Sequence, residues 1–360
     1  MVVYIFVTLL VVLLGVLIKD NFIYTDRAQI SDRQKSINRV SLFFVYFVLA
    51  FLSGTRVAVG NDYWVYRDNF KLIAQQRVVS SEIGFNGIVK LVQWFAGYDN
   101  YKPVFFVFSA ITVFFFVKAL YDQSEWFAAS LFLLLANGFY FSSLNTVRYY
   151  LAFAIALFSI KLLWQEKHLA FLLLILVTAT IHKTFLCVIP IYYLAKINWK
   201  KRDIPFVAVA SVLLLVLKGY VRKIMFIIYP YYEGTYLDDN HISYINILKA
   251  TAVLVFSVIY YKKAIKGSPI NRFYFNLNIG ALIVFSCLWY LPETTRLGYY
   301  LSASNIFLIP SIIKAIDNRK QRIFWAVVIG LAYMAFFLFY LRSLYAVNIR
   351  ILPYYNLFFA

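Results

Sequence analysis

Four short segments of an otherwise apolar chain contain arginine, histidine and carboxylate residues, the types that can carry out group transfer. Arginine binds phosphate oxygens through a bidentate fork, and a carboxylate or a neutral imidazole can take a proton from a hydroxyl group. The segments read "GTRVAVGNDYWVYRDNF" (54–70), "LNTVRYYLAF" (144–153), "TIHKTF" (180–185) and "PETTRLGYY" (292–300). These residue types predict a reaction on a phosphorylated substrate, carried out by side chains that the surrounding apolar sequence must position.

The composition is that of an integral membrane protein. Of the 360 residues, 63% are hydrophobic and 14% are charged, and the mean hydropathy is +0.74; a soluble protein is about half apolar and about a quarter charged. Apolar stretches recur along the whole chain, which predicts an all-α, polytopic membrane protein. The formal net charge of +19 is spread over short loops. We therefore expect it to set the topology and to attract anionic lipid, and we expect no nucleic-acid partner.

About twelve membrane spans fit the apolar stretches, and no separate soluble domain is visible, so residues 1–360 are expected to form a single transmembrane domain. The first stretch has no basic start and no small-residue cleavage site, and we expect it to be a retained span. Two pairs of expected spans, 149–163 with 169–181 and 184–195 with 204–217, are short, and one of them is a candidate for a re-entrant segment. The expected spans are 2–18, 40–54, 103–118, 126–143, 149–163, 169–181, 184–195, 204–217, 246–261, 273–290, 298–313 and 323–341.

The placement of Lys and Arg predicts which side of the membrane each loop faces. With the loop after the first span in the cytoplasm, the cytoplasmic segments hold more basic residues than the external ones, in clusters at 200–202, 262–266 and 319–322. Both ends of the chain then lie outside, together with all four segments quoted above. The sequence thus predicts that one external rim carries Arg56, Asn145, Arg148, His182 and Arg296.

The segment at 54–70 has two interpretations. Belts of Trp and Tyr at the membrane surface explain a solvated loop at the end of a span. A functional site is favoured because Arg56 and Asp62 stand close together, with Gly54 and Gly60 to bend the chain. The following stretch, "SEIGFNGIVKLVQWFAGY" (81–98), predicts an amphipathic helix on the membrane surface. An external loop and helix are therefore expected at about 55–101.

The segments that hold Arg148, His182 and Arg296 also have two interpretations each. Arg148 is expected at the start of a span, where it either faces a polar cavity or snorkels to the interface. Asn145 stands three residues earlier and is expected on the same helical face. Arg296 is likewise a functional or a snorkelling residue. His182 lies between two short apolar spans, as a hydrogen-bonded structural residue or as a proton acceptor.

An external site narrows the chemistry, because nucleotide sugars and ATP are absent there and any donor must already be activated on a lipid. A sugar linked to a polyprenyl pyrophosphate fits, since Arg can bind the pyrophosphate and stabilise its departing charge. Tyr and Trp can pack on sugar rings. The three His residues lack metal-ligand spacing, and no glycine-rich phosphate loop is present. We therefore expect no metal, nucleotide or other cofactor.

The quoted segments occur in the order and spacing of the EpsG family, which this chain resembles over nearly its whole length. The segments that carry the resemblance are "SGTRVAVGNDYWVYRDNF", "SEIGFNGIVKLV", "LNTVRYYLAFAIALFSIKLL", "TIHKTFLCVIPIYYL" and "ETTRLGYYLSASNIFLIPSII". The family pattern commonly reads N-x-x-R-Q, and here Tyr149 replaces the Gln. The family is similar to the Wzy-type polymerases of O-antigen, capsule and exopolysaccharide. The resemblance implies a GT-C-like glycosyltransferase, independent of metal and nucleotide, in the bacterial cytoplasmic (inner) membrane, with its active site facing the periplasm.

The implied reaction transfers an undecaprenyl-pyrophosphate-linked oligosaccharide onto a second lipid-linked repeat unit. Membrane lipids surround such a protein, and a chain-length regulator is a candidate partner. We expect His182 to be the base and Asp62 to position Arg56 or the acceptor sugar; the reversed roles are the alternative. The resemblance implies a catalytic set of His182, Asp62 and Glu82 and a substrate-binding set of Arg56, Tyr63, Tyr66, Asn145, Arg148 and Arg296.

Two other functions stay open. A lipid-linked oligosaccharide flippase is a transporter and should place cationic residues mid-span in two similar halves. In this chain the mid-span regions are nearly free of charge and no halves match, which favours the enzyme. An O-antigen ligase-like transferase shares the chemistry but uses another acceptor.

Overall fold

The computed structural model describes residues 1–19, 31–77, 79, 82–235, 238, 241–346 and 349–358. Within these residues the chain is helical, and the β-bridge between Arg56 and Asn356 is isolated. The expected all-α class is therefore confirmed. The chain divides into two compact units: unit 1 comprises Met1–Val188 and Asp317–Ala360, and unit 2 comprises Ile189–Ile316.

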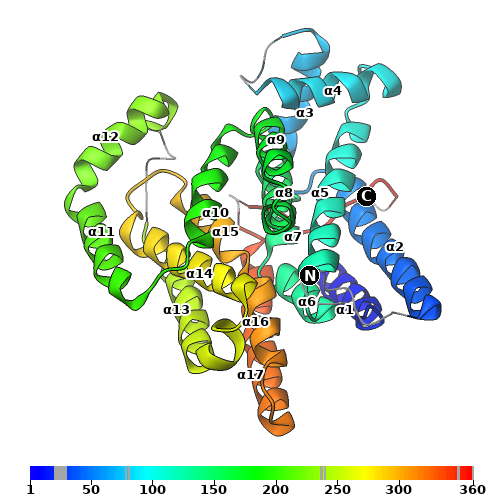
Figure 1. The fold of residues 1–360 in the computed structure, drawn as a ribbon. Helices are drawn as coiled ribbons and strands as arrows, with labels where there is room; N and C mark the ends of the chain where they lie inside the picture. The colour runs from blue at the N-terminus through cyan, green and yellow to red at the C-terminus, as the bar shows by residue number, and fades with distance from the viewer. Residues whose placement is uncertain are drawn as a thin grey trace. The chain divides into compact units, whose positions relative to one another are not determined.

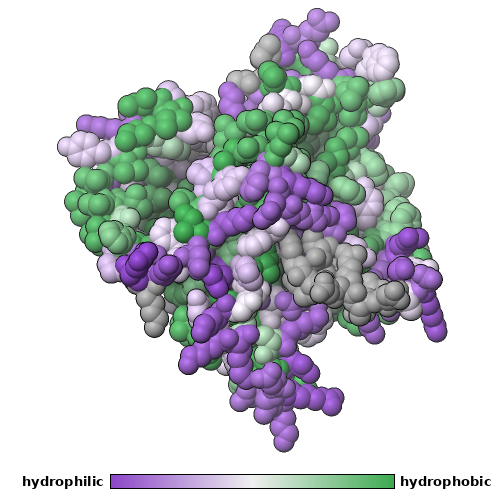
Figure 2. All heavy atoms as spheres, in the orientation of Figure 1, coloured by the Kyte–Doolittle hydropathy of each residue, from purple (hydrophilic) through white to green (hydrophobic). Residues whose placement is uncertain are grey.

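Four helices are long and apolar enough to cross a membrane: α2 (Asp32–Gly54), α5 (Lys102–Gln123), α8 (Val147–Trp164) and α17 (Arg319–Ser343). A fifth candidate is the pair α11 (Ile204–Val216) and α12 (Lys218–Ile228), which is bent by 76°. Apolar residues cover much of the surface over this pair (Figure 2). The chain is therefore a membrane protein with four or five helices of spanning length among its described residues. The larger count of about twelve spans and the GT-C architecture stay predictions.

Unit 1 contains the helices that hold most of the segments of interest (Figure 1). Its long helices α5 and α8 pack side by side and run in the same direction, because α6 and α7 return the chain between them. At their C-terminal ends, Gln123 Nε2 donates to Leu157 O over 2.7 Å, and Lys161 Nζ lies 2.6 Å from Asp122 Oδ2. The other elements of unit 1 are α1 (Val2–Val16), α3 (Asp62–Ala74), α4 (Ile83–Ala96), α6 (Phe127–Ala136), α7 (Phe139–Ser142), α9 (His168–Ala179) and the 3₁₀ helix η1 (Lys183–Cys187).

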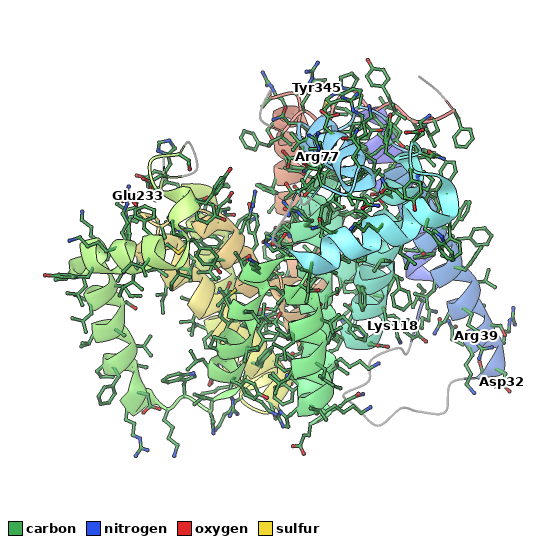
Figure 3. All side chains as sticks on the ribbon, turned by 90° about the horizontal axis from the view of Figure 1, so that it is seen from above. Asp32, Arg39, Arg77, Lys118, Glu233 and Tyr345 are labelled. Atoms are coloured by element: carbon green, nitrogen blue, oxygen red, sulfur yellow. The ribbon has the colours of Figure 1, made fainter. Side chains whose placement is uncertain are left out.

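The helix α2 shows how the sequence defines a membrane helix here. Ser31 caps its first turn by accepting the N–H of Gln34 at 3.2 Å, which satisfies a donor that the helix leaves free. Asp32 and Arg39 mark its charged beginning (Figure 3). One side then buries Val45, Leu49 and Leu52, and the other exposes Phe43, Phe47 and Phe51. Such an exposed apolar side suits contact with lipid.

A connection from α2 to α3 lies against the C-terminal segment of the same unit. Val57 N–H donates to Tyr355 O at 3.0 Å, Gly60 N–H to Arg350 O at 2.9 Å, and Leu357 N–H to Thr55 O at 2.9 Å. Gly60 has a φ of +92°, and a Cβ there would lie 2.9 Å from the Leu144 carbonyl oxygen. Only glycine fits this turn without strain, as the expected bend requires.

The stretch expected at about 55–101 holds α3 and α4, while its residues 78, 80 and 81 lie outside the described residues. Helix α4 buries Phe85 and Val89 on one side and exposes Leu91, Trp94 and Phe95. This is the pattern of an amphipathic helix, and its position on the membrane surface stays a prediction.

Unit 2 is a second helical body with its own polar core contacts. Asn305 Nδ2 donates to Asn278 Oδ1 at 2.7 Å, and Asn278 Nδ2 donates to Ala250 O at 2.9 Å. These bonds tie three helices together in a largely apolar interior. Besides α11 and α12, its elements are α10 (Val188–Lys196, which begins at the boundary), η2 (Lys201–Asp203), η3 (Pro230–Tyr232), α13 (Tyr244–Ile259), the π-helical turn η5 (Tyr261–Ile265), α14 (Pro269–Cys287), α15 (Thr294–Ser302) and α16 (Asn305–Lys314).

Candidate functional site

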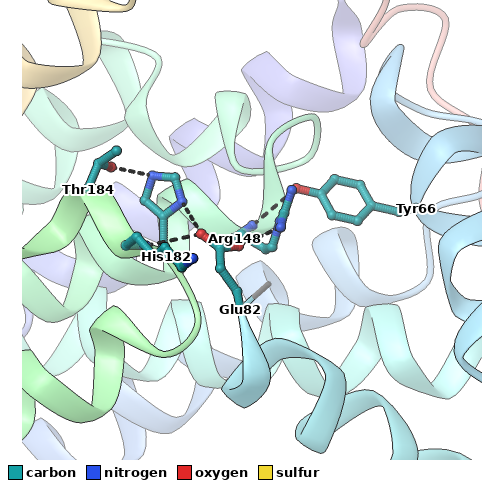
Figure 4. Close-up of polar contacts among 6 residues, drawn as sticks. Tyr66, Glu82, Arg148, His182 and Thr184 are labelled. Atoms are coloured by element: carbon teal, nitrogen blue, oxygen red, sulfur yellow. Dashed lines mark hydrogen bonds and ion pairs between the residues drawn. The ribbon is translucent and has the colours of Figure 1, made fainter. Parts of the chain in front are cut away.

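The carboxylate of Glu82 joins an arginine and a histidine in unit 1 (Figure 4). Its Oε2 lies 2.5 Å from Arg148 Nη1, and its Oε1 lies 3.6 Å from His182 Nδ1. The backbone N–H of Lys183 also donates to Oε1, at 3.0 Å. Glu82 precedes α4, Arg148 lies in the first turn of α8, and His182 precedes η1. One carboxylate thus brings together three separate segments, and we call Glu82, Arg148 and His182 the Glu82 cluster.

The two nitrogens of His182 have different partners. Nδ1 faces Glu82, whereas Nε2 lies 2.8 Å from the Thr184 hydroxyl oxygen. This arrangement fits the tautomer with its proton on Nδ1, in which Nε2 accepts a hydrogen bond from Thr184. A carboxylate behind Nδ1 that leaves Nε2 as an acceptor is the arrangement of a general base.

Tyr149 fixes the ring of His182 from another side. The two rings lie 5.8 Å apart at 81°, edge to face, and Tyr149 is buried. This is the position where the sequence has Tyr in place of the Gln of the family pattern. Tyr149 therefore limits the rotation of the imidazole through packing.

Arg148 is held by aromatic rings as well as by Glu82. Its guanidinium carbon lies 4.9 Å from the centre of the Phe85 ring and 5.9 Å from that of Tyr66, distances at which a cation is attracted to a ring. Its backbone N–H donates to the Tyr66 hydroxyl at 3.4 Å. The side chain remains 30% exposed. Since a guanidinium has five donors, it can bind Glu82 and an additional anion together.

A second cluster of polar side chains surrounds Asp62, the first residue of α3. The backbone N–H of Asp62 donates to Asn145 Oδ1 at 3.0 Å, and the Thr146 hydroxyl donates to Asp62 Oδ2 at 3.3 Å. Helix α8 begins only at Val147. The expectation that Asn145 and Arg148 share a helical face is therefore wrong, because Asn145 precedes the helix and instead satisfies an N–H at the start of α3.

Arg56 and Tyr63 are buried within unit 1 and do not reach the Glu82 cluster. Arg56 is 2% exposed; its Nε donates to Leu144 O at 3.0 Å and its Nη1 to Ser109 Oγ at 3.1 Å and to Ser53 O. Burial lowers the pKa of Arg56 to about 10, so the guanidinium stays charged at pH 7. Tyr63 stacks on Phe105 at 4.5 Å.

These contacts correct the expectation that Arg56 lies at an external rim. Arg56 takes carbonyl and hydroxyl oxygens as partners among the described residues. Of the two roles expected for Asp62, positioning Arg56 by a direct ion pair is therefore not observed there, and positioning the acceptor sugar stays a prediction. Arg56 and Tyr63 anchor the 55–70 segment on α5, through Ser109 and Phe105 respectively.

Arg296 belongs to unit 2. Its Nε lies 2.9 Å from Glu293 Oε2, one helical turn earlier, and its side chain is 37% exposed. A partly exposed arginine of this kind can still meet an anionic ligand, so its substrate-binding role stays a prediction.

The charge of Glu82 is set by its neighbours. Burial alone would raise the pKa of this carboxyl group, but the nearby imidazole of His182, the positive charge of Arg148 and the N–H of Lys183 outweigh burial. The pKa of Glu82 therefore lies below its ordinary value, and the group is a carboxylate at neutral pH. Among the described residues, no three His, Cys, Asp or Glu side chains are grouped so that they could hold a metal ion.

A comparison with protein families shows to which family the chain belongs. The model of the EpsG family matches residues 39–356, a range that includes the whole Glu82 cluster, all of unit 2 and most of unit 1. The chain belongs to the EpsG family. Members of the EpsG family are Wzy-like polysaccharide polymerases, which implies a polymerase of the glycosyltransferase type. Comparisons with curated proteins and with solved structures gave no match.

Within this EpsG-family chain, sequence reasoning missed the partners of His182. It named Glu82, Arg148 and His182 separately, without pairing them, and it did not consider Thr184 or the N–H of Lys183. The signal was the stretch "TIHKTF", in which a hydroxyl follows the histidine by two residues. The 3₁₀ turn of η1 brings that hydroxyl back to the ring.

Proposed function

We propose that the protein polymerises lipid-linked polysaccharide repeat units at the outer face of the cytoplasmic membrane. It transfers an undecaprenyl-pyrophosphate-linked glycan onto a sugar hydroxyl of a second lipid-linked repeat unit. Membership of the EpsG family supports the reaction class. The observation that carries the proposal is the Glu82 carboxylate in contact with both Arg148 and His182.

In this proposal His182 is the general base. The acceptor hydroxyl takes the place of the Thr184 hydroxyl at Nε2 and gives its proton to that nitrogen as its oxygen bonds to the anomeric carbon of the donor. The bond from that carbon to the pyrophosphate oxygen breaks, and the pyrophosphate leaves with the electron pair. Glu82 keeps the proton on Nδ1 and stabilises the imidazolium that forms.

Arg148 binds the pyrophosphate of the donor. The anion meets the exposed part of the guanidinium, and the developing negative charge strengthens this contact in the transition state. Tyr66 and Phe85 hold the guanidinium in place through the contacts described above. For Arg296, which belongs to unit 2, we propose separately that it binds an anionic group of a substrate.

The remaining residues of the proposed site position these groups. Asp62 and Asn145 fix the start of α8, from which Arg148 projects, through the Asn145 and Thr146 hydrogen bonds. Arg56 and Tyr63 anchor the same segment from inside the protein. We propose these four as positioning residues, and not as groups that touch the substrate.

Deletion in the native host, followed by sizing of the surface polysaccharide, tests the function. Loss of a polymerase leaves single repeat units on the surface, because export and attachment continue. Loss of a flippase removes surface display altogether, and that outcome would reject the proposal. Complementation with the His182→Ala chain should leave single units, and the wild-type chain should restore long polymers.

A further inference from the structure

Helix α12 (Lys218–Ile228) buries none of its side chains, although most of them are apolar. Tyr220, Ile224, Ile227 and Ile228 follow one side of the helix, and each is more than half exposed. An isolated helix of this length is marginal in water. Its apolar side therefore requires a covering medium.

If α11 runs along the membrane normal, its length brings α12 close to a membrane surface. Helix α11 has 13 residues and is about 20 Å long at about 1.5 Å per residue, which is shorter than the hydrocarbon core of about 30 Å. At its end the chain bends by 76° into α12, as Figure 1 shows. A helix in the membrane interface lies about 5–10 Å deep. This depth accounts for most of the difference between the length of α11 and the thickness of the hydrocarbon core.

The other side of α12 is basic. Lys218 and Arg222 occupy the sector opposite the isoleucines, and Lys223 lies at the edge of the apolar side, one turn before Ile227. Arg222 is engaged by Asp238 at 2.6 Å and lies 5.3 Å from the Phe226 ring centre, so the two lysines carry most of the charge available to a ligand. These residues would be costly inside the hydrocarbon core.

Tyrosines flank the helix at the position expected of an aromatic belt. Tyr220 lies in its first turn and Tyr231 follows its end, and both are largely exposed. Tyr is enriched at the boundary between lipid and water. The apolar side thus suits the hydrocarbon of one leaflet, the tyrosines suit the boundary between lipid and water, and the basic side suits the lipid headgroups.

We propose that α12 is an interfacial helix whose apolar side lies in one leaflet and whose lysines bind the phosphate groups of anionic phospholipids. The partner is a lipid surface of negative charge. This surface lies in unit 2, takes no part in the transfer reaction, and is independent of the proposed function.

Fluorescent labels on the full-length chain in vesicles test this proposal. Single cysteines at Ile227→Cys and Lys218→Cys, on opposite sides of the helix and with Cys187 and Cys287 changed to serine, would carry an environment-sensitive dye. In vesicles of phosphatidylcholine and phosphatidylglycerol, the dye at 227 should be quenched by shallow lipid-borne quenchers and shielded from iodide. The dye at 218 should be open to iodide.

The lysines are tested by Lys218→Gln/Lys223→Gln. The docked fraction reported at position 227 should fall in anionic vesicles, by about fivefold in equilibrium constant for each lysine removed, and should not change in pure phosphatidylcholine. The matched control Lys262→Gln/Lys263→Gln removes two exposed lysines of η5 and should change neither.

Three results would overturn the proposal. Iodide quenching at both positions would place α12 in water. Deep lipid quenching at both would make α12 the second half of a span. Shielding of position 227 from lipid and iodide quenchers alike would mean that protein covers it.

Discussion

Replacing Glu82 by glutamine keeps the shape of the side chain and removes its charge. In the proposed mechanism the carboxylate faces the imidazolium that forms on His182, and 3.6 Å separates Oε1 from Nδ1. At that distance the attraction amounts to about 1 kcal/mol in a water-like medium and about 5 kcal/mol at an effective dielectric constant of about 20. Glu82→Gln should therefore lower turnover by roughly tenfold to a thousandfold.

The assay uses purified protein in vesicles with a lipid-linked repeat unit and measures turnover and donor affinity separately. Donor affinity should stay close to that of the wild type, because Arg148 keeps its own charge. The matched control is Asp68→Asn, which removes an exposed carboxylate of α3 paired with Arg67 at 2.7 Å and should be silent. Thermal melting of each variant separates a loss of turnover from a loss of folding.

Two results would refute the reasoning about Glu82. If a folded Glu82→Gln protein turned over at the wild-type rate, the carboxylate would have no role in the proton transfer. If only donor affinity fell, Glu82 would act through Arg148, and His182 would work without it.

Three further predictions follow from individual residues. Arg148→Lys and Arg296→Lys should each slow chain growth by about 10- to 100-fold, since a lysine cannot replace a charge-assisted bidentate contact; Arg322→Lys should be silent, and full activity in the first two would favour snorkelling arginines. Because the folded-state pKa of Glu82 is lowered from its ordinary value of 4.5, its contacts stabilise the protein above that pH and are lost as the pH falls through the lowered pKa. The melting-temperature gap between the wild type and Glu82→Gln should thus be full at neutral pH and shrink below about pH 4.5; a gap independent of pH would contradict this. A cysteine at Asp99 should react with an impermeant thiol reagent from outside the cell and one at Gly267 should not, and the opposite labelling would reverse the assigned topology.

The sequence sufficed for the class of protein and for the segments that matter. Helical periodicity and apolar length predicted α2, α5, α8 and α17, because a long apolar helix needs no tertiary information. The turn at Gly60 was predictable because a glycine is the residue that bends the chain most easily, which is also a local property. The segments around Glu82, Arg148 and His182 were also predictable, because their charged and polar residue types stand out from the apolar stretches beside them.

The pairing of side chains was not predictable, because it depends on where separate helices meet. Arg56 was expected at an external rim, yet Leu144 and Ser109 from later segments surround it. Asn145 was expected on a helix that in fact begins two residues later, at Val147. The contact of Glu82 with His182 joins α4 to η1, and no local pattern in the sequence encodes that contact.

The most direct test of the account is the activity of His182→Ala in the purified polymerase assay, beside Asp62→Asn. The account predicts that His182→Ala binds the lipid-linked donor normally while turnover falls by about 10²–10⁴-fold, and that Asp62→Asn weakens folding or binding instead. Normal polymerisation by His182→Ala, together with an Asp62→Asn protein that binds donor but cannot turn it over, would contradict it and make Asp62 the base.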